Sequence, residues 1–286
     1  MTAVRIKSPA ALPEKGETGM PKINANGINI NYEQQGFGEP LVLIPYTTAD
    51  QTCYAFQVAE YAKHFTCISI DPRGAGETDK PEGVYSTELF ADDVSAFMQA
   101  VGVDRAHISG VSLGAATGMS LAAKYPEKVK SLSLHGGWSK TDSFLRTVVE
   151  GWQVMAKGSG SVTEMAIKGI LPWCFTPNLY AENPDFIETI IGFIRSRPEQ
   201  PVKAFLQQSD AVLAHDVEPH LTKITAPTQI TFGQYDMLTS RFADRMMAGI
   251  QGAELIVFEG CAHATLYERV EEFNEKTLAF LQRHSG

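Results

Sequence analysis

Two patterns of apolar residues alternate along the chain from about residue 22 onward. Short, continuous apolar runs end at glycine, proline or aspartate, and longer stretches between them repeat apolar residues at helical spacing. Short apolar runs without polar alternation are typical of strands that are buried on both faces of a parallel sheet. The pattern therefore predicts buried strands over residues 41–44, 65–70, 106–111, 129–134, 228–232 and 254–258.

The stretches between these runs predict helices over residues 87–101, 113–124, 240–250 and 264–283. Near the N-terminus, residues 22–26 and 28–34 predict two strands joined at Asn26-Gly27, which is a favoured hairpin turn pair. Strands that alternate with helices at this spacing form βαβ units with right-handed crossovers. We expect an α/β protein with a mostly parallel sheet and helices on both of its faces.

Residues 138–222 break the alternation. This segment has no run typical of a buried strand, but it repeats large apolar residues at helical spacing between glycine and proline breaks. We predict a helical cap inserted into an α/β core that comprises residues 21–137 and 223–286. Residues 1–20 are polar, with several prolines and glycines, and predict a flexible tail without an apolar run long enough for a signal peptide.

Composition excludes several classes of protein. A length of 286 residues, with 44% hydrophobic and 20% charged residues, suits one large globular domain. The net charge of -9 argues against nucleic acid as a partner and disfavours polyanionic substrates, although a local basic pocket can override the net sign. No stretch approaches the ~20 apolar residues that cross a bilayer, so no membrane partner is expected. The four cysteines lack C-x-x-C spacing, which favours a cytoplasmic protein without a zinc site.

The pentapeptide Gly110-Val111-Ser112-Leu113-Gly114 lies between a predicted strand and a predicted helix. In this G-x-S-x-G pattern, a tight turn projects the serine hydroxyl from the end of a sheet, and the flanking glycines relieve crowding. The N-terminal amides of the following helix face any negative charge that develops near the serine. The motif therefore predicts Ser112 as a nucleophile.

A serine nucleophile needs a base within hydrogen-bond reach and a group that orients the base. His263 follows the last predicted strand and precedes the terminal helix, which places it at the same edge of the sheet as Ser112. Asp236, on the loop after the strand over residues 228–232, is the predicted orienting acid. The chain order is serine, acid, histidine.

From about residue 22 to its end, the chain resembles the α/β-hydrolase-fold proteins. Four local matches carry the resemblance, namely residues 110–114, residues 71–76 after a strand, residues 233–236, and residues 260–263 before the last helix. The resemblance implies a serine hydrolase with Ser112 as nucleophile, His263 as base and Asp236 as orienting acid. It also implies that residues 138–222 form the helical cap of this family.

The sequence departs from the family pattern after the strand over residues 41–44. Many members have His-Gly there, and the amide of the next residue forms half of the oxyanion hole, whereas this chain has Pro45-Tyr46-Thr47. A backbone donor does not depend on its side chain, so we expect the N–H groups of Thr47 and Leu113 to form the oxyanion hole. Tyr46 is then expected beside the site, as a wall of the acyl pocket or as an extra polar contact.

Other residues near the expected site have competing interpretations. A cap must cover the site, so some of Trp138, Trp152, Trp173 and Phe175 are expected to line an apolar pocket, the others forming the core of the cap. Asp142 is the alternative acid, because some hydrolases of this fold place the acid after the strand over residues 129–134. His135, at the end of that strand, is expected to be a packed, hydrogen-bonded histidine.

The expected reaction is hydrolysis of carboxylic ester or lactone bonds in small, fairly apolar substrates through an acyl-enzyme, without a metal or an organic cofactor. Serine as nucleophile excludes the branches of the fold that use aspartate. Carbon–carbon bond hydrolases and cofactor-free perhydrolases share the triad and stay open, as does a non-catalytic scaffold that binds a ligand. The oligomeric state also stays open, because an apolar cap face can pair with a second copy or pack inward.

Overall fold

The computed structural model describes residues 21–286, and every run predicted as a strand forms one. The predicted tail, residues 1–20, lies outside the described residues. The strands are β1 Lys22–Ala25, β2 Ile28–Gly36, β3 Glu39–Ile44, β4 Phe65–Ile70, β5 Ala106–Val111, β6 Val129–His135, β7 Thr228–Gly233 and β8 Glu254–Phe258.

Twelve α-helices and several shorter helical turns occur in the same residues. The α-helices are α1 Ala55–Tyr61, α2 Thr87–Ala100, α3 Leu113–Lys124, α4 Ser143–Ser159, α5 Val162–Met165, α6 Leu171–Cys174, α7 Pro177–Glu182, α8 Pro184–Ser196, α9 Val202–Ala214, α10 Ala243–Gly249, α11 Thr265–Glu268 and α12 Val270–Arg283. The shorter turns are the 3₁₀ helices η1 Gln51–Tyr54, η2 Pro126–Lys128, η4 Glu218–Lys223 and η5 Ser240–Phe242, and the π-helix η3 Ala166–Ile170.

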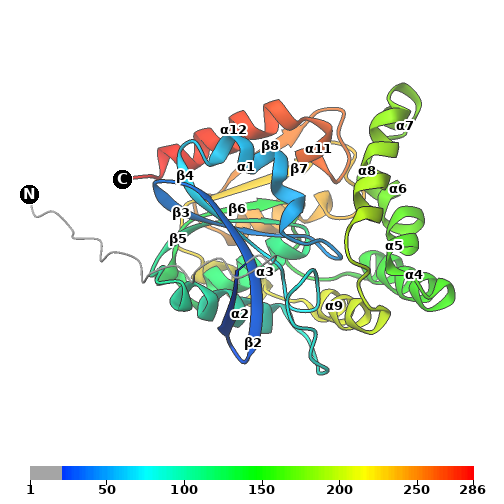
Figure 1. Cartoon of the computed structure of the whole chain (residues 1–286). Coiled ribbons are helices and arrows are strands. Elements are labelled where there is room, and N and C mark those ends of the chain that lie inside the picture. The colour runs from blue at the N-terminus through cyan, green and yellow to red at the C-terminus, as the bar shows by residue number, and fades with distance from the viewer. Residues whose placement is uncertain (1–20) are drawn as a thin grey trace, which may run out of the picture.

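All eight strands form one sheet in the order β1-β2-β4-β3-β5-β6-β7-β8. The pairs β1·β2 and β2·β4 are antiparallel, and every other pair is parallel. Helices α2 and α3 pack on one face of the sheet, and α1 and α12 pack on the other (Figure 1). The prediction of a mostly parallel sheet covered by helices on both faces is confirmed.

Burial along the strands matches their apolar runs, except at the sheet edge. Every residue of β5 and β7 is buried, as expected for strands between two layers of helices. In β8, however, Leu255 and Val257 are 38% and 48% exposed. β8 is the edge strand, and only the side that carries Phe258 joins the core formed with α12. A continuous apolar run alone therefore did not distinguish this edge strand from a central one.

Asn26-Gly27 joins β1 to β2 as predicted. Both residues have positive φ, 48° for Asn26 and 75° for Gly27. A tight hairpin turn whose twist matches that of its strands requires this conformation at both central positions, and asparagine and glycine adopt it most readily.

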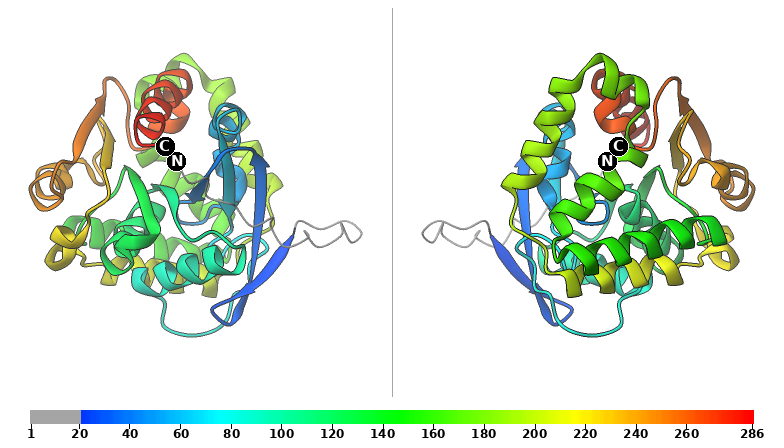
Figure 2. Two further views of the ribbon diagram at one scale, coloured as in Figure 1. Left: turned by 90° about the vertical axis from the view of Figure 1, so that its left-hand side faces the viewer. Right: turned by 90° about the vertical axis from the view of Figure 1, so that its right-hand side faces the viewer.

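Helices α4 to α9 all lie between β6 and β7 in the chain. Figure 1 and the right-hand view of Figure 2 show them gathered at one end of the molecule, beyond the carboxyl ends of the parallel strands. The chain enters and leaves this helical segment through a short paired stem, an antiparallel bridge between Lys140 and Asp216. Two backbone hydrogen bonds extend it, from Thr141 N–H to the His215 carbonyl (2.9 Å) and from Val217 N–H to the Ser139 carbonyl (2.8 Å).

Two helices differ from the sequence prediction. Helix α1 was not predicted, because its seven residues are too few to show a helical repeat of apolar positions. The terminal helix, predicted as continuous over residues 264–283, is interrupted at Arg269, whose backbone is not helical (φ -137°, ψ 55°). The interruption separates α11, which carries Glu268, from the long amphipathic helix α12.

Candidate active site

Ser112 occupies the turn between β5 and α3. Its backbone has φ 54° and ψ -114°, a conformation that is rare for any residue other than glycine. The Ser112 N–H donates to the carbonyl of His135 at the end of β6 (2.8 Å), and the Ser112 carbonyl accepts from Ala115 and Ala116 in the first turn of α3. Strand, turn and helix therefore fix this strained backbone together.

The glycines of the motif allow the close contacts that the turn requires. A Cβ atom on Gly110 would lie 2.2 Å from the carbonyl oxygen of Gly114. A Cβ atom on Gly114 would lie 2.0 Å from the carbonyl oxygen of Ile44, at the end of β3. Glycine at position 114 thus lets the N-terminus of α3 approach the segment that continues into Thr47.

His263 and Asp236 meet at the same edge of the sheet, after β8 and β7 respectively. The distance from His263 Nδ1 to Asp236 Oδ2 is 2.9 Å, and both side chains are buried. Asp236 also accepts hydrogen bonds from the N–H groups of Leu238 (2.9 Å) and Thr239 (3.0 Å) and from the Thr239 hydroxyl (2.8 Å). A carboxylate held in this way orients the imidazole so that Nε2 is directed away from it.

The environment of Asp236 keeps its carboxyl group ionised. Burial by itself would raise the pKa of Asp236, but attraction to His263 and the hydrogen bonds from His263 and Thr239 outweigh burial and hold the pKa below its ordinary value. The imidazole of His263 is confined as well. A Cβ atom on Gly136, which has a φ of 58°, would lie 2.8 Å from His263 Cε1.

Of the two residues predicted to form an oxyanion hole, Thr47 lines both pockets with Ser112, and Leu113 directly follows Ser112 in the chain. Leu113 is the first residue of α3, so its N–H has no acceptor within the helix. Thr47 lies in a tight turn closed by a hydrogen bond from Ala49 N–H to the Tyr46 carbonyl (3.1 Å), and Thr48 in this turn has a left-handed φ of 70°.

Two pockets meet at Ser112 and His263. The larger encloses about 740 Å³, including part of its mouth, and its walls come from the Tyr46–Thr48 turn, the π-helix η3, α6, α8, Ala264 and α11. The smaller encloses about 360 Å³ and extends between α4, α9 and Thr239. Thr47, Trp152 and Leu238 also line both pockets, so the two pockets join beside Ser112.

The residues predicted to line a pocket are distributed unequally. Tyr46, Trp152 and Phe175 line the larger pocket, and Trp138 and Trp152 line the smaller. Trp173 is not among the described residues that line these two pockets. Its ring packs edge-on against Phe144, with 6.2 Å between the ring centroids. Apolar spacing placed Trp173 in the helical segment but could not show which side of a four-residue helix it occupies.

Several pocket residues were not predicted. Arg197, Tyr267 and Cys174 line the larger pocket together with Ser112. Tyr267 donates to the carbonyl of Cys53 (2.8 Å), and its hydroxyl lies 3.2 Å from that of Tyr46. Burial raises the pKa of Tyr46 to about 12, so the phenol is neutral. The sequence contains no signal that separates Arg197 from Arg195, an exposed arginine two residues earlier.

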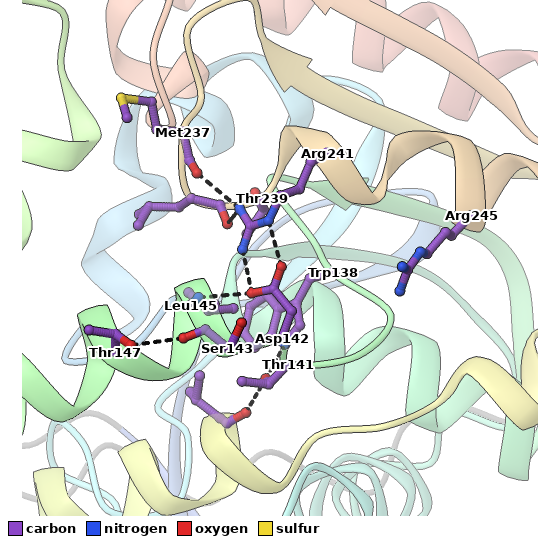
Figure 3. A network of polar contacts seen from close by, with 12 residues as sticks. Trp138, Thr141, Asp142, Ser143, Leu145, Thr147, Met237, Thr239, Arg241 and Arg245 are labelled. Carbon is purple, nitrogen blue, oxygen red and sulfur yellow. Dashed lines mark hydrogen bonds and ion pairs between the residues drawn. The ribbon is translucent and has the colours of Figure 1, made fainter.

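Asp142, the alternative acid, is engaged elsewhere. Its carboxylate receives two hydrogen bonds from Arg241, each 2.7 Å long, and caps α4 by accepting from Leu145 N–H (2.8 Å). Arg241 also donates to the carbonyls of Met237 and Leu238, directly after Asp236 (Figure 3). This network links the start of α4 to the Asp236 loop. The carboxylate that pairs with His263 is that of Asp236.

His135 is packed and hydrogen-bonded, as predicted. Its ring nitrogens lie 2.8 Å from the Thr231 hydroxyl and 3.2 Å from the Ser109 hydroxyl, and its side chain is 1% exposed. Burial lowers its pKa to about 3. Residues 21–286 contain no group of three or more His, Cys, Asp or Glu side chains placed to hold a metal ion. The same residues form no helix that is both long and apolar enough to span a membrane.

Comparison with known proteins defines the family. Residues 40–270 match the family model described as alpha/beta hydrolase fold, so the chain belongs to the α/β-hydrolase-fold family. The chain is 28% identical over 268 residues to the protein named "Putative carbamate hydrolase RutD" of Azorhizobium caulinodans, covering 91% of this chain and 98% of that protein. It is 30% identical over 201 residues to a 2-hydroxy-6-oxo-6-phenylhexa-2,4-dienoate hydrolase of Comamonas testosteroni, covering 66% of this chain and 67% of that protein.

A solved structure agrees with the fold. The enol-lactonase of Burkholderia xenovorans LB400 is similar to this structure with a TM-score of 0.83 at 25% identity, over 92% of this chain and 100% of that one. The protein is thus a hydrolase of the α/β fold that resembles proteins acting on several kinds of bond.

Proposed function

We propose that this protein is a serine hydrolase that cleaves carboxylic ester or lactone bonds of small molecules. The observation that carries the proposal is the convergence of Ser112, His263 and Asp236 at one edge of the sheet, with Ser112 and His263 lining both pockets. A nucleophile on a strained turn, a histidine and a buried orienting carboxylate are the parts that acyl transfer requires.

In the proposed reaction, His263 accepts the proton of Ser112 as the hydroxyl oxygen attacks the carbonyl carbon. Asp236 holds the imidazole in the productive tautomer and stabilises the imidazolium that forms. The N–H groups of Leu113 and Thr47 stabilise the oxyanion, and a donor of this kind typically contributes ~2.7–4 kcal/mol. His263 then protonates the leaving oxygen and activates the water that releases the acyl group. No step needs a metal ion or an organic cofactor.

The helical segment between β6 and β7 is the proposed cap. Its helices supply the walls of both pockets opposite Ser112, including Trp152 from α4 and Ile190 from α8. These walls are mostly apolar, which favours small substrates with an apolar body. The similarity to an enol-lactonase supports lactones and esters as the substrate class.

Cleavage of a carbon–carbon bond next to a ketone is the second candidate, favoured by the 30% identity to a dienoate hydrolase. Carbamate hydrolysis and cofactor-free perhydrolysis need the same three side chains. A panel of 4-nitrophenyl esters of increasing chain length, several lactones, a carbamate and a vinylogous diketone acid separates these activities. Turnover of esters or lactones above the other classes supports the proposal. Binding of ligands without any turnover would support a non-catalytic scaffold.

Replacement of Ser112 or His263 by alanine tests the assignment directly. We expect kcat for ester hydrolysis to fall by about 10⁴–10⁶ in either variant, because the two residues act as one unit. A fluorophosphonate probe should label the wild-type protein at Ser112 and leave Ser112→Ala unlabelled. Ser120→Ala, in the middle of α3, is the matched control, and near-normal ester turnover by Ser112→Ala would contradict the proposal.

A further inference from the structure

Arg197 places a buried positive charge in the larger pocket. It directly follows α8, its side chain is 11% exposed, and it lines the same pocket as Ser112 and His263. Of the described residues that line this pocket, Arg197 alone carries a permanent charge. The remaining walls are mostly aliphatic and aromatic, so an anion bound beside Arg197 would be poorly screened by water.

The guanidinium of Arg197 is incompletely satisfied by the protein. Its Nη1 atom is buried and has no hydrogen-bond partner in the structure. The nearest carboxylate oxygen, Asp50 Oδ1, is 3.9 Å from Nη1, which is beyond hydrogen-bond distance. That oxygen already accepts from the N–H of Thr52 (3.0 Å) and from the Thr52 hydroxyl. A buried donor without a partner is costly, so the protein alone does not fully satisfy this guanidinium.

The neighbouring phenols make this end of the pocket polar. Because Tyr267 donates its hydroxyl proton to the Cys53 carbonyl, Tyr46 must donate to Tyr267, and the lone pairs of Tyr46 stay available. Arg197 is within electrostatic range of both phenols and of Asp50. The guanidinium is further held over the ring of Phe193, 5.1 Å from its centroid. The Arg197 side chain is therefore held in place by Phe193 and by its electrostatic interactions with the phenols and Asp50, as a binding group requires.

We propose that Arg197 binds a carboxylate of the substrate, so that the natural substrate is an ester or lactone that bears one carboxylate several bonds from the scissile carbonyl. This inference rests on the proposed hydrolase function and specifies its substrate class. A planar carboxylate matches the two parallel N–H donors of a guanidinium. Asp50 offsets part of the charge, which suits a monoanion better than a phosphate dianion. The apolar walls between Arg197 and Ser112 accommodate the carbon chain.

A pair of substrates of almost identical shape tests the proposal. The first is the 4-nitrophenyl monoester of adipic acid, which is anionic, and the second is the 4-nitrophenyl ester of adipamic acid, which is neutral. We expect wild-type kcat/KM to favour the anionic ester by about 10–100-fold, because one charge-assisted contact distinguishes the two. In Arg197→Gln the ratio of the two kcat/KM values should fall to near one, and in Arg197→Lys it should be intermediate.

Arg195→Gln is the matched control, because Arg195 is an exposed arginine of α8 that is paired with Glu164 (3.2 Å). It should keep the wild-type ratio. If Arg197→Gln lowers kcat/KM equally for both esters, with a lower melting temperature, Arg197 is a structural link to Asp50 and the proposal is wrong. An unchanged ratio in Arg197→Gln would overturn it as well.

Calorimetry on Ser112→Ala separates this inference from the hydrolase proposal. Monomethyl adipate should bind at least about tenfold more tightly than methyl adipamate, and Arg197→Gln in the Ser112→Ala background should abolish the difference. If the wild-type protein hydrolyses neither ester but this binding difference is present, the reaction is wrong and the carboxylate site stands. If esters are hydrolysed without any charge preference in rate or binding, the reaction stands and the carboxylate site is refuted.

Discussion

At the scale of single residues, the backbone of Ser112 is held in a strained conformation. A non-glycine residue with φ 54° and ψ -114° is strained by on the order of 1–3 kcal/mol. The hydrogen bond to His135 and the close packing of Gly110 and Gly114 maintain this geometry. The strain directs the serine side chain toward the junction of the two pockets, where no relaxed turn would place it.

The identity of the orienting acid can be tested by removing its charge. In Asp236→Asn we expect kcat to fall by about 10³–10⁴, because asparagine favours the wrong imidazole tautomer. Asp142→Asn is the matched control, since its carboxylate is bonded to Arg241 and to the first turn of α4. It should keep kcat within about threefold and lower the free energy of unfolding by no more than about 1 kcal/mol, because asparagine still caps α4 and only the partly exposed ion pair with Arg241 is lost. A silent Asp236→Asn together with an inactive Asp142→Asn would show that the acid is misplaced.

The three residues of the proposed triad could be selected from the sequence because each follows a strand and is marked by a local motif. Arg197 and Tyr267 could not, because their approach to Ser112 depends on how α8 and α11 pack against the core. Trp173 shows the same limit, because the spacing of apolar residues does not distinguish a side chain that lines a pocket from one that packs on Phe144.

At the scale of elements, central strands were the most predictable and short or interrupted helices the least. A run such as Ala106–Val111 must be buried on both faces, and its composition alone shows this. Helix α1 and the break at Arg269 depend on tertiary contacts instead. At that break, Glu268 turns back to accept from Ala262 N–H, directly before His263.

Glu268 connects the helical segment to the His263 loop. Its other carboxylate oxygen accepts from the N–H (2.8 Å) and the hydroxyl (3.0 Å) of Thr176, between α6 and α7. A second link runs from Ala264 N–H to the Cys174 carbonyl (2.9 Å). The Glu268 carboxylate and this backbone hydrogen bond therefore couple the position of these helices to that of the proposed base.

Removal of the Glu268 side chain should leave the position of His263 less well fixed. In Glu268→Ala we expect kcat and the rate of fluorophosphonate labelling to fall together by about tenfold, and the free energy of unfolding to fall by about 1–3 kcal/mol. Glu272→Ala, which removes a surface ion pair with Lys276 on α12, should change neither rate. If stability falls in Glu268→Ala while both rates are kept, Glu268 supports the fold without positioning His263.

At the scale of the whole molecule, buried histidines make stability depend on pH. Burial lowers the pKa of His135 to about 3 and that of His215 to about 4, from an ordinary value of 6.5. Burial keeps His215 neutral, although the hydrogen bond from one ring nitrogen to the Trp138 carbonyl (3.0 Å) acts in the opposite direction and raises its pKa. Its other ring nitrogen lies 2.8 Å from the Thr87 hydroxyl. Below pH 6.5 these histidines are therefore protonated in the unfolded chain but stay neutral in the folded protein. Their contribution to the free energy of unfolding must fall as the pH falls toward 4.

Denaturant unfolding at pH 7, 6, 5 and 4.5 measures this effect. Each histidine should contribute a slope of up to about 1.4 kcal/mol per pH unit below its unfolded pKa. Replacement of His215 by glutamine should lower the slope by up to about 1.4 kcal/mol per pH unit, and the control His220→Gln, whose side chain is exposed, should leave the slope unchanged. A free energy of unfolding that is constant from pH 7 to 5 would show that these histidines titrate in the folded protein.

The paired stem at Lys140 and Asp216 has a consequence for how this protein can diversify. Because the two ends of the α4–α9 segment leave the sheet side by side, a segment of different length or sequence can be joined there without stretching the core. The three residues of the proposed triad lie outside that segment, whereas Arg197 and Trp152 lie within it. Under the proposed function, the catalytic side chains and a large part of the pocket wall therefore belong to separate stretches of chain. An exchange of residues 143–214 between related hydrolases should transfer the preference of one protein to the chemistry of another.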